Sequence, residues 1–218
     1  IGDYGICNCP ALEILVLGAN VTNIGYQGIR GNSAIKELTI PNQSVTTGYY
    51  WNDYVDPEIV KVRSDATSIT QAFLDYSKTT AFEVIEAYDE TAEANYKVDE
   101  EGVLYSADGK EVIRYPRAKE AAEYEVAAGT ETMRANAFKE IQLEKITLPE
   151  GLTNISEAAF YNSDKLKELI IPDSVTSIGN NGITEMSSVQ KVVVGDGVTS
   201  IGDYGICNCP ALEILVLG

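Results

Sequence analysis

Short runs of alternating apolar and polar residues recur along the chain at a fixed interval. Three of them begin 23 residues apart: KELIIP (167–172), QKVVVG (190–195) and EILVLG (213–218). In the first run, Leu169 and Ile171 lie two positions apart, so a β-strand would direct both side chains to one face and Ile170 to the other. Pro or Gly closes each run, which favours a turn. The pattern predicts one short strand in every repeat.

A second signal precedes each run, a four-residue motif of the form V-T-x-I. It recurs every 23 residues, at 152–155 (with Leu in the first position), 175–178 and 198–201. An apolar residue follows five positions after the Ile, as Phe160 follows Ile155. We expect these two positions to form the wall opposite the strand. One coil cannot bury its apolar side alone, so neighbouring coils must stack and form a parallel sheet along one side.

The same unit appears near the other end, where V-T-N-I at 21–24 leads to KELTIP at 36–41. Between the two ends the pattern weakens, and alternating runs flank Asp108-Gly109, a dipeptide that favours a tight hairpin turn. We therefore expect a single continuous solenoid over residues 1–218. Its predicted parts are regular coils at 1–49, degenerate coils at 50–94, a β-hairpin insert at 95–128 and regular coils at 129–218.

One segment occurs twice: residues 201–218 repeat residues 1–18 letter for letter, as IGDYGICNCPALEILVLG. Chance does not produce such a match among coils that otherwise vary. Three origins fit it: a 200-residue super-repeat in the parent protein, a local duplication of one cassette, or a window cut from a periodic assembly. Because solenoids need polar caps and this chain starts and stops within a coil, we expect it to be part of a longer array.

These motifs together resemble the BspA-like leucine-rich repeat, also named after the Treponema pallidum repeats. The resemblance rests on V-T-x-I-G, on a small-apolar pair such as Ala159-Phe160 or Gly28-Ile29, and on L-x-I-P. YKVDEEGVLYSADGKEVIRYP (96–116) also resembles a hairpin insert of that family. The resemblance implies a right-handed solenoid of about 22–23 residues per coil, α/β-type or mainly β. It further implies an extracellular setting, on the bacterial cell surface or secreted, and a binding role rather than catalysis.

The amino-acid composition argues against several classes of partner and site. The net charge is −17, from 33 acidic and 16 basic residues, and such a surface repels phosphate, so nucleic acid is not an expected partner. The chain has no His, which removes Ser-His-Asp and Cys-His nucleophiles and the commonest metal ligand. No apolar run is long enough to span a membrane in this segment. We expect no catalytic, metal or cofactor site.

Four groups of residues are candidates for binding or assembly, and the first two are an apolar stripe and an aromatic cluster. The outward strand positions Ile170, Val193 and Val216, with Val16 in the duplicated segment, form an apolar stripe. It either reflects β-propensity alone or contacts a partner. Aromatic residues cluster at Tyr50, Trp51 and Tyr54, either as a contact surface or as a plug over an irregular coil.

Cysteines and carboxylates form the remaining candidates. Cys9 fits an apolar slot and is expected in the core, whereas Cys7 and its copy Cys207 are expected to point outward. Each could cross-link two chains, bond to its neighbour or stay free. The acidic residues at 99–101 and Asp108 are expected to be solvated loop charges, with a weak calcium site as the alternative.

Two functions follow from these observations. The first is a cell-surface repeat protein whose sheet face mediates adhesion or binds a surface protein of a host or neighbouring cell. The second is a structural segment of a long tandem-repeat filament or stalk with a 200-residue super-repeat, whose partner is another copy in head-to-tail assembly.

Overall fold

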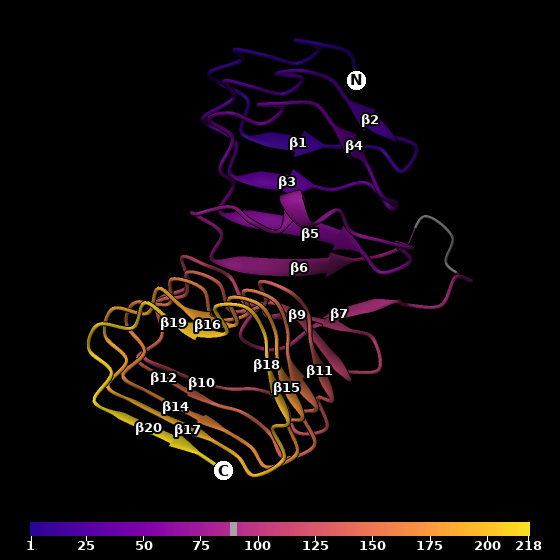
Figure 1. Ribbon diagram of the computed structural model, residues 1–218. Helices are drawn as coiled ribbons and strands as arrows, with labels where there is room; N and C mark the ends of the chain where they lie inside the picture. The colour runs from indigo at the N-terminus through magenta and orange to yellow at the C-terminus, as the bar shows by residue number, and fades with distance from the viewer. Residues whose placement is uncertain (88–90) are drawn as a thin grey trace. The chain divides into compact units, whose positions relative to one another are not determined.

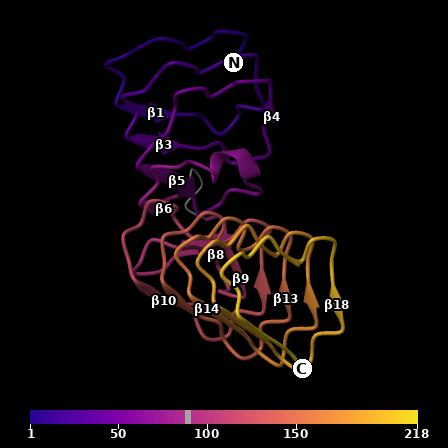
Figure 2. The ribbon, with the colours of Figure 1, turned by 60° about the vertical axis from the view of Figure 1, so that its left-hand side comes forward.

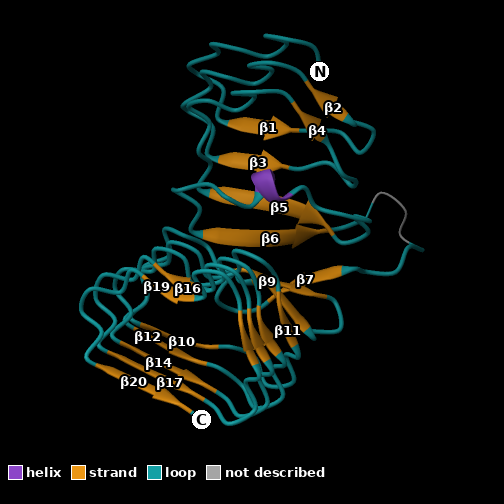
Figure 3. Ribbon diagram, in the orientation of Figure 1, coloured by secondary structure: helices purple, strands orange, loops and turns teal. Residues whose placement is uncertain are grey.

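The computed structural model describes residues 1–87 and 91–218, which divide into two compact units, Ile1–Gly102 and Val103–Gly218. Residues 88–90, inside the stretch 50–94 for which we expected degenerate coils, lie outside the described residues. Short strands make up nearly all the regular structure (Figure 3). The only helix in the described parts of the chain is a single 3₁₀ turn, η1 (Gln71–Phe73). The mainly β form of the predicted solenoid is therefore the observed one, and its continuity from one unit to the next stays a prediction.

Unit 1 is built on a parallel sheet whose strands succeed one another along the coil axis (Figure 1). Its strands are β1 (Ile14–Val16), β3 (Glu37–Thr39), β5 (Ile59–Arg63) and β6 (Ala81–Ile85). Paired residues are 22 or 23 positions apart, and one inward column runs Leu15, Leu38, Val60, Phe82. A second wall pairs β2 (Asn23–Ile24) with β4 (Thr46–Thr47), and β7 (Tyr96–Val98) lies near the end of the unit. The coil length predicted from the sequence is confirmed.

Unit 2 has coils with three walls, which can be followed in Figure 2. The sheet wall holds β10 (Glu123–Glu125), β12 (Lys145–Thr147), β14 (Glu168–Ile171), β17 (Lys191–Val194) and β20 (Ile214–Leu217). The second wall holds β11 (Thr132–Met133), β13 (Asn154–Ile155), β15 (Ser177–Ile178) and β18 (Ser200–Ile201). The third wall pairs β16 (Ile183–Thr184) with β19 (Ile206–Cys207).

The core of unit 2 lies between these walls, with the side chains in the predicted register. Leu169 and Ile171 are buried and Ile170 is exposed, while Ile155 and Phe160 are buried on the facing side. Phe160 stacks on Phe138 with ring centroids 5.6 Å apart, and this pair links two neighbouring coils. Each coil therefore buries its apolar face only by stacking on its neighbours.

The predicted hairpin is present. β8 (Leu104–Ser106) and β9 (Glu111–Arg114) pair antiparallel, and Gly109 takes a left-handed backbone in the turn, with φ of 76°. The Asp108 carboxylate accepts hydrogen bonds from the Lys110 amide (3.0 Å) and the Ser106 hydroxyl (2.6 Å), which fixes the turn. β9 also pairs parallel with β11, so the hairpin joins the second wall of the coils.

The glycine after V-T-x-I lies where two neighbouring coils approach closely. A Cβ at Gly179 would lie 2.8 Å from the Glu157 amide nitrogen, and one at Gly25 would lie 2.7 Å from the Asp3 nitrogen. Glycine is therefore favoured in this slot, because the backbone of the preceding coil approaches closely. Ser156 occupies this slot once, and its hydroxyl donates a hydrogen bond to the Met133 carbonyl.

Among the described residues, seven coils turn through two left-handed residues four positions apart, on the side away from the sheet. These pairs are Tyr4 and Asn8, Gln27 and Gly31, Tyr50 and Tyr54, Asn136 and Glu140, Ala158 and Asn162, Asn181 and Glu185, and Tyr204 and Asn208. Their φ angles lie between 50° and 76°, and only one of the residues is glycine. Left-handed backbone costs an L-residue about 1–2 kcal/mol, so the stacking of the coils must offset this strain.

Candidate functional site

The sheet wall of unit 2 presents a ladder of alternating charges at the first outward position of four of its strands, β10, β12, β14 and β17. Glu123, Lys145, Glu168 and Lys191 occupy this column. Lys145 Nζ lies 3.1 Å from a Glu123 carboxylate oxygen, and Lys191 Nζ lies 2.6 Å from one of Glu168. We call this column the charged ladder. Exposed pairs of this kind add little stability, but they fix which charges a partner meets.

A further ion pair lies just before the strands, between Lys167 and Glu144. The hydrogen bond from the Lys167 ammonium, with its charge, lowers the pKa of the Glu144 carboxyl. Glu144 therefore stays ionised at neutral pH, and its charge is matched by a lysine of the next coil.

The second outward column of the sheet wall is apolar. Ile170, Val193 and Val216 lie on neighbouring strands, and the pairing of β14, β17 and β20 places them directly beside one another. Ile170 is 54% exposed, Val216 is 46% exposed and Val193 is half-buried. We call these three residues the apolar stripe. The structure thus brings together the three stripe residues of unit 2 that the sequence indicated.

A groove of about 430 Å³ lies over the sheet wall between β12 and β14. These two strands belong to separate hydrogen-bonded ladders, so the sheet has a seam at this point. The inward residues Ile146, on β12, and Leu148, just after it, are slightly exposed, whereas Leu169 on β14 is fully buried. The groove is lined by members of both columns and by the chain around the two strands: Glu123, Glu144, Lys145, Ile146, Thr147, Leu148, Glu150, Lys167, Glu168, Ile170 and Pro172. It joins apolar area to charged rims, as protein-binding surfaces do.

Val16, the fourth predicted stripe residue, lies on unit 1. It is exposed next to Ile14 on β1, but its neighbours in the column are Thr39 and Lys61. Lys61 bridges Glu37 (2.8 Å) and Glu83 (3.4 Å), and the hydrogen bond that its ammonium donates to Glu37 raises the pKa of the lysine. The sheet of unit 1 therefore carries paired charge where unit 2 carries the apolar stripe.

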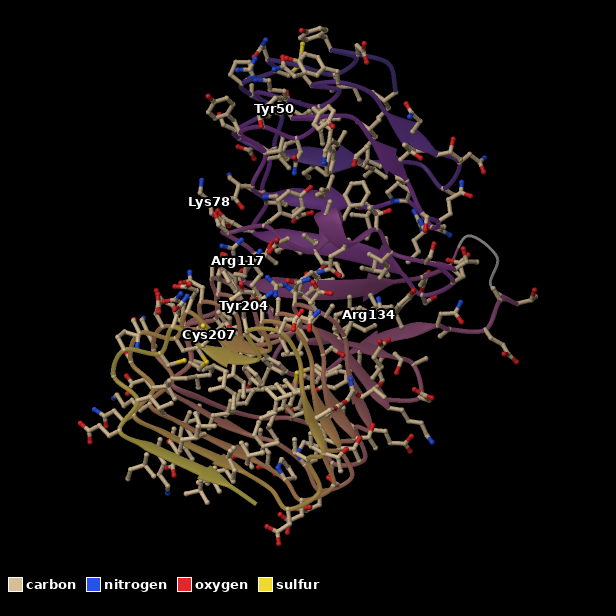
Figure 4. The ribbon with its side chains drawn as sticks, viewed as in Figure 1. Tyr50, Lys78, Arg117, Arg134, Tyr204 and Cys207 are labelled. Carbon is tan, nitrogen blue, oxygen red and sulfur yellow. The ribbon has the colours of Figure 1, made fainter. Side chains whose placement is uncertain are left out.

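The aromatic cluster divides into a buried and an exposed part. Trp51 is 6% exposed and packs on Phe73 with ring centroids 4.8 Å apart. Of the two roles considered it therefore has that of the packing plug, and its place in the candidate contact surface is corrected because the indole fills the core. Tyr50 and Tyr54 are exposed on the turn side, and Figure 4 labels the first of them. Tyr54 also lies under the Arg30 guanidinium, 5.5 Å away.

Tyr50 belongs to a row of rings that the sequence reading missed. Tyr26 contacts Tyr4 and Tyr50 edge to face, with centroids 5.5 Å and 6.3 Å apart. The spacings of 22 and 24 residues between the three tyrosines were the available signal. The charged ladder had a similar signal, because glutamate and lysine alternate every 22 or 23 residues from Glu123 to Lys191.

All four cysteine thiols are free. Cys7 and Cys207 are half-buried, so each is less outward than expected, and Figure 4 labels Cys207 on its coil. Cys9 is exposed, contrary to the core position expected, because it lies on the first coil of unit 1. Its copy Cys209 is half-buried, packs against the core, and approaches the Ile183 carbonyl at 3.7 Å. The slot is therefore a core slot only when a coil precedes it.

The loop carboxylates cap turns. Asp99 accepts a hydrogen bond from the Glu101 amide at 3.0 Å, as Asp108 does from Lys110. Across residues 1–87 and 91–218, no three His, Cys, Asp or Glu side chains are arranged to hold a metal ion. Within the described residues, no helix is long and apolar enough to cross a membrane.

A family model described as "BspA type Leucine rich repeat region" matches the chain in six copies, over residues 1–94 and 119–218. No curated protein matches it significantly. Solved structures that it resembles are a leucine-rich repeat protein from Eubacterium ventriosum (17% identity, TM-score 0.60), a leucine rich cell surface protein from Faecalibacterium prausnitzii (16%, 0.61) and the pneumococcal vaccine antigen PcpA (19%, 0.52). The likeness covers 94%, 96% and 93% of this chain, but 73%, 61% and 57% of those chains. At these identities it establishes a shared fold.

Proposed function

Because the chain belongs to the BspA-type leucine-rich repeat family, we propose that it is a surface or secreted repeat protein that binds a protein partner through the sheet wall of unit 2. Leucine-rich repeats of this kind are typically non-enzymatic binding scaffolds. One of the structural relatives is described as a cell surface protein and another as a vaccine antigen, which supports a location outside the cell. The partner we favour is a protein on a host or neighbouring cell, so the binding is adhesive.

The observation that carries this proposal is the apolar stripe beside the groove. Ile170 belongs to both, since it lines the groove and pairs with Val193 in the register. Exposed, contiguous apolar area rimmed by charge is typical of interaction sites. The charged ladder beside it presents both signs, so it sets the register of a partner more than its affinity.

The double variant Ile170→Lys, Val193→Lys tests the proposal. Labelled protein is added to intact host cells or neighbouring bacterial cells, before and after the cells are shaved with protease. We expect binding that depends on cell-surface protein, and at least a tenfold loss in the variant, which corresponds to about 1.4 kcal/mol. Thr153→Lys, Thr176→Lys is the matched control, because both threonines are exposed on the second wall of the same unit. Equal binding of the stripe variant and the wild type would refute the role of this surface.

A structural segment in a tandem array is the second candidate function. It is favoured by one observation: the two copies of the 18-residue segment take up the same turn, with φ of 53° and 54° at Tyr4 and Tyr204. An array with a 200-residue super-repeat would place such a coil once in every period. The coding sequence around this chain tests the idea, since an array requires the 200-residue period to continue there.

A further inference from the structure

The two sides of the sheet wall of unit 2 differ in charge. On the side where the strands begin, each lysine of the charged ladder is paired with a glutamate of a neighbouring coil, and Lys167 is paired in the same way with Glu144. On the side where the strands end, an acidic residue follows the Pro or Gly beyond three successive strands, β12, β14 and β17. These residues are Glu150, Asp173 and Asp196, and we call them the acidic edge.

The acidic edge carries negative charge without partners of opposite charge. All three side chains are exposed, and within the described residues no ion pair joins any of them to a lysine or an arginine. The Asp173 carboxylate accepts a hydrogen bond from the Asp196 amide at 3.0 Å, so these members of the edge lie on adjacent coils. Since neighbouring strands are about 5 Å apart, the edge is a row of closely spaced carboxylates that attracts cations.

The groove over the seam connects the acidic edge with the apolar stripe. Its lining includes Ile170 of the stripe, Glu150 of the edge, and Pro172, which separates the stripe from the edge on the next coil. A ligand that enters the groove therefore meets an aliphatic surface and an unpaired carboxylate together. This shared lining is the observation that determines the chemistry of the ligand.

The other charges in the groove are already paired. Lys145 and Lys167 line it, and each is held by a glutamate that also lines it. Glu168, the remaining acidic residue of the lining, is held by Lys191 at 2.6 Å. The charge that remains for a ligand is therefore that of Glu150, and it is negative.

Unit 1 provides a comparison within the chain. The residues that follow the Gly and Pro beyond β1 and β3 are Ala19 and Asn42, and both are uncharged. The column that corresponds to the apolar stripe includes Lys61 there. The acidic edge thus accompanies the apolar stripe, and the solenoid repeat alone does not require it.

We propose that the partner of this surface presents an extended protein segment in which lysine or arginine alternates with an aliphatic residue. This proposal rests on the protein-binding function proposed above and specifies the chemistry of the partner. Successive side chains of an extended segment point to opposite sides. A segment laid along the coil axis, between the stripe and the edge, directs its aliphatic side chains to Ile170 and Val193. Its cationic side chains then pair with Glu150 and Asp173.

Charge complementarity selects this segment over other occupants. An acidic segment would place its carboxylates beside the acidic edge and find the lysines of the groove already paired. A wholly apolar segment would remove water from the carboxylates without replacing it, which is costly. A second copy of this chain has the same net charge of −17 and is repelled, whereas a cationic partner is attracted over a distance.

Three heptapeptides test the chemistry of the partner on the full chain: KVKVKVK, EVEVEVE and KSKSKSK. Each is labelled with a dye and titrated with the protein to about 1 mM while fluorescence anisotropy is followed. We expect KVKVKVK to bind at least about fivefold more tightly than either of the others, because it alone meets both the stripe and the edge. Equal binding of EVEVEVE or KSKSKSK, or no binding of KVKVKVK, overturns the proposal.

The double variant Glu150→Gln, Asp173→Asn locates the binding on the acidic edge. It keeps the shape of both side chains, and Asn can still accept the hydrogen bond from the Asp196 amide. We expect it to weaken binding of KVKVKVK about fivefold at low ionic strength, since exposed ion pairs contribute modestly. The effect should shrink as ionic strength rises from about 0.01 M to about 0.15 M, where the Debye length falls from about 30 Å to about 8 Å.

The matched control variant is Glu157→Gln, Asp203→Asn. It removes the same charge from exposed side chains that follow β13 and β18 on the second wall of unit 2. We expect a change of less than about twofold, because long-range attraction alone is affected. Equal losses in the two variants would mean that the peptide responds only to the total charge, and the proposal would be overturned.

The cell-binding assay separates this proposal from the function on which it rests. A loss of binding in Ile170→Lys, Val193→Lys without a loss in Glu150→Gln, Asp173→Asn would leave the binding function standing and overturn the basic partner. Unchanged binding of the stripe variant would refute the function itself. Losses in both variants, with binding retained in the second-wall control, are the result that we expect.

Discussion

Replacing Leu169 and Ile170 by alanine, one at a time, tests the register of the sheet wall. The two residues are neighbours on β14, but Leu169 is fully buried and Ile170 is 54% exposed. Leu169→Ala removes three carbon groups from the core, worth about 2.4 kcal/mol in transfer free energy. An incompletely relaxed cavity adds on the order of 1 kcal/mol, for a total loss of about 3 kcal/mol.

The cost at Ile170 should be much smaller. About half of its side chain is already in water, so the transfer loss is about 1 kcal/mol, and no cavity forms. We therefore expect the free energies of unfolding of the two variants to differ by about 2 kcal/mol. Urea unfolding followed by far-UV circular dichroism measures the difference, and peptide-resolved hydrogen exchange locates it in unit 2. Equal losses, or a larger loss for Ile170→Ala, would mean that the strand is shifted by one residue and would refute the register.

Two further predictions use matched positions in the chain. Ala158→Gly relieves a left-handed alanine with φ of 51°, whereas Ala159→Gly removes a fully buried methyl group. The Ala159→Gly variant should therefore be about 2 kcal/mol less stable than the Ala158→Gly variant in urea unfolding. Equal stability of the two variants would contradict the strain assigned to the turn. Burial raises the pKa of the Cys209 thiol while Cys9 is exposed, so at pH 8 maleimide should label Cys9 several-fold faster. The tryptic peptides ending at Arg30 and beginning at Val192 each hold two cysteines, so fragmentation by tandem mass spectrometry assigns the label to one of them. Equal rates at Cys9 and Cys209 would refute the difference in burial.

The fold could be predicted from the sequence because its information is local and periodic. Apolar residues two apart in KELIIP determine the inward face, and the 23-residue spacing determines which strands are neighbours. The turn residues carried no comparable signal. Left-handed positions are held by Tyr, Glu, Ala and Asn alike, and only Asn has a chemical preference for this backbone. The strain is a property of how the coils stack, and the sequence of one coil does not show it.

The candidate site was predictable only in part, for a related reason. The outward position of Ile170 and Val193 could be predicted from the strand register. The groove depends on a seam between β12 and β14, and no residue type in the sequence indicates that seam. Trp51 shows the opposite case. It belongs to an aromatic cluster in the sequence, but it packs on Phe73 in the core while its neighbours Tyr50 and Tyr54 are exposed. Composition indicates what a surface could bind, whereas adjacency between coils determines which residues form the surface.

The duplicated segment makes this distinction with the sequence held constant. Leu17 and Leu217 have the same eighteen-residue surroundings along the chain, yet one is buried and the other is mostly exposed. Cys9 and Cys209 differ in the opposite sense, with the later copy the more buried. Each coil edge is therefore apolar by sequence but covered only by a neighbour, and the two copies are covered on opposite edges. The burial of a residue in such a solenoid is therefore determined by the coils that flank it, and the sequence of its own coil does not determine it.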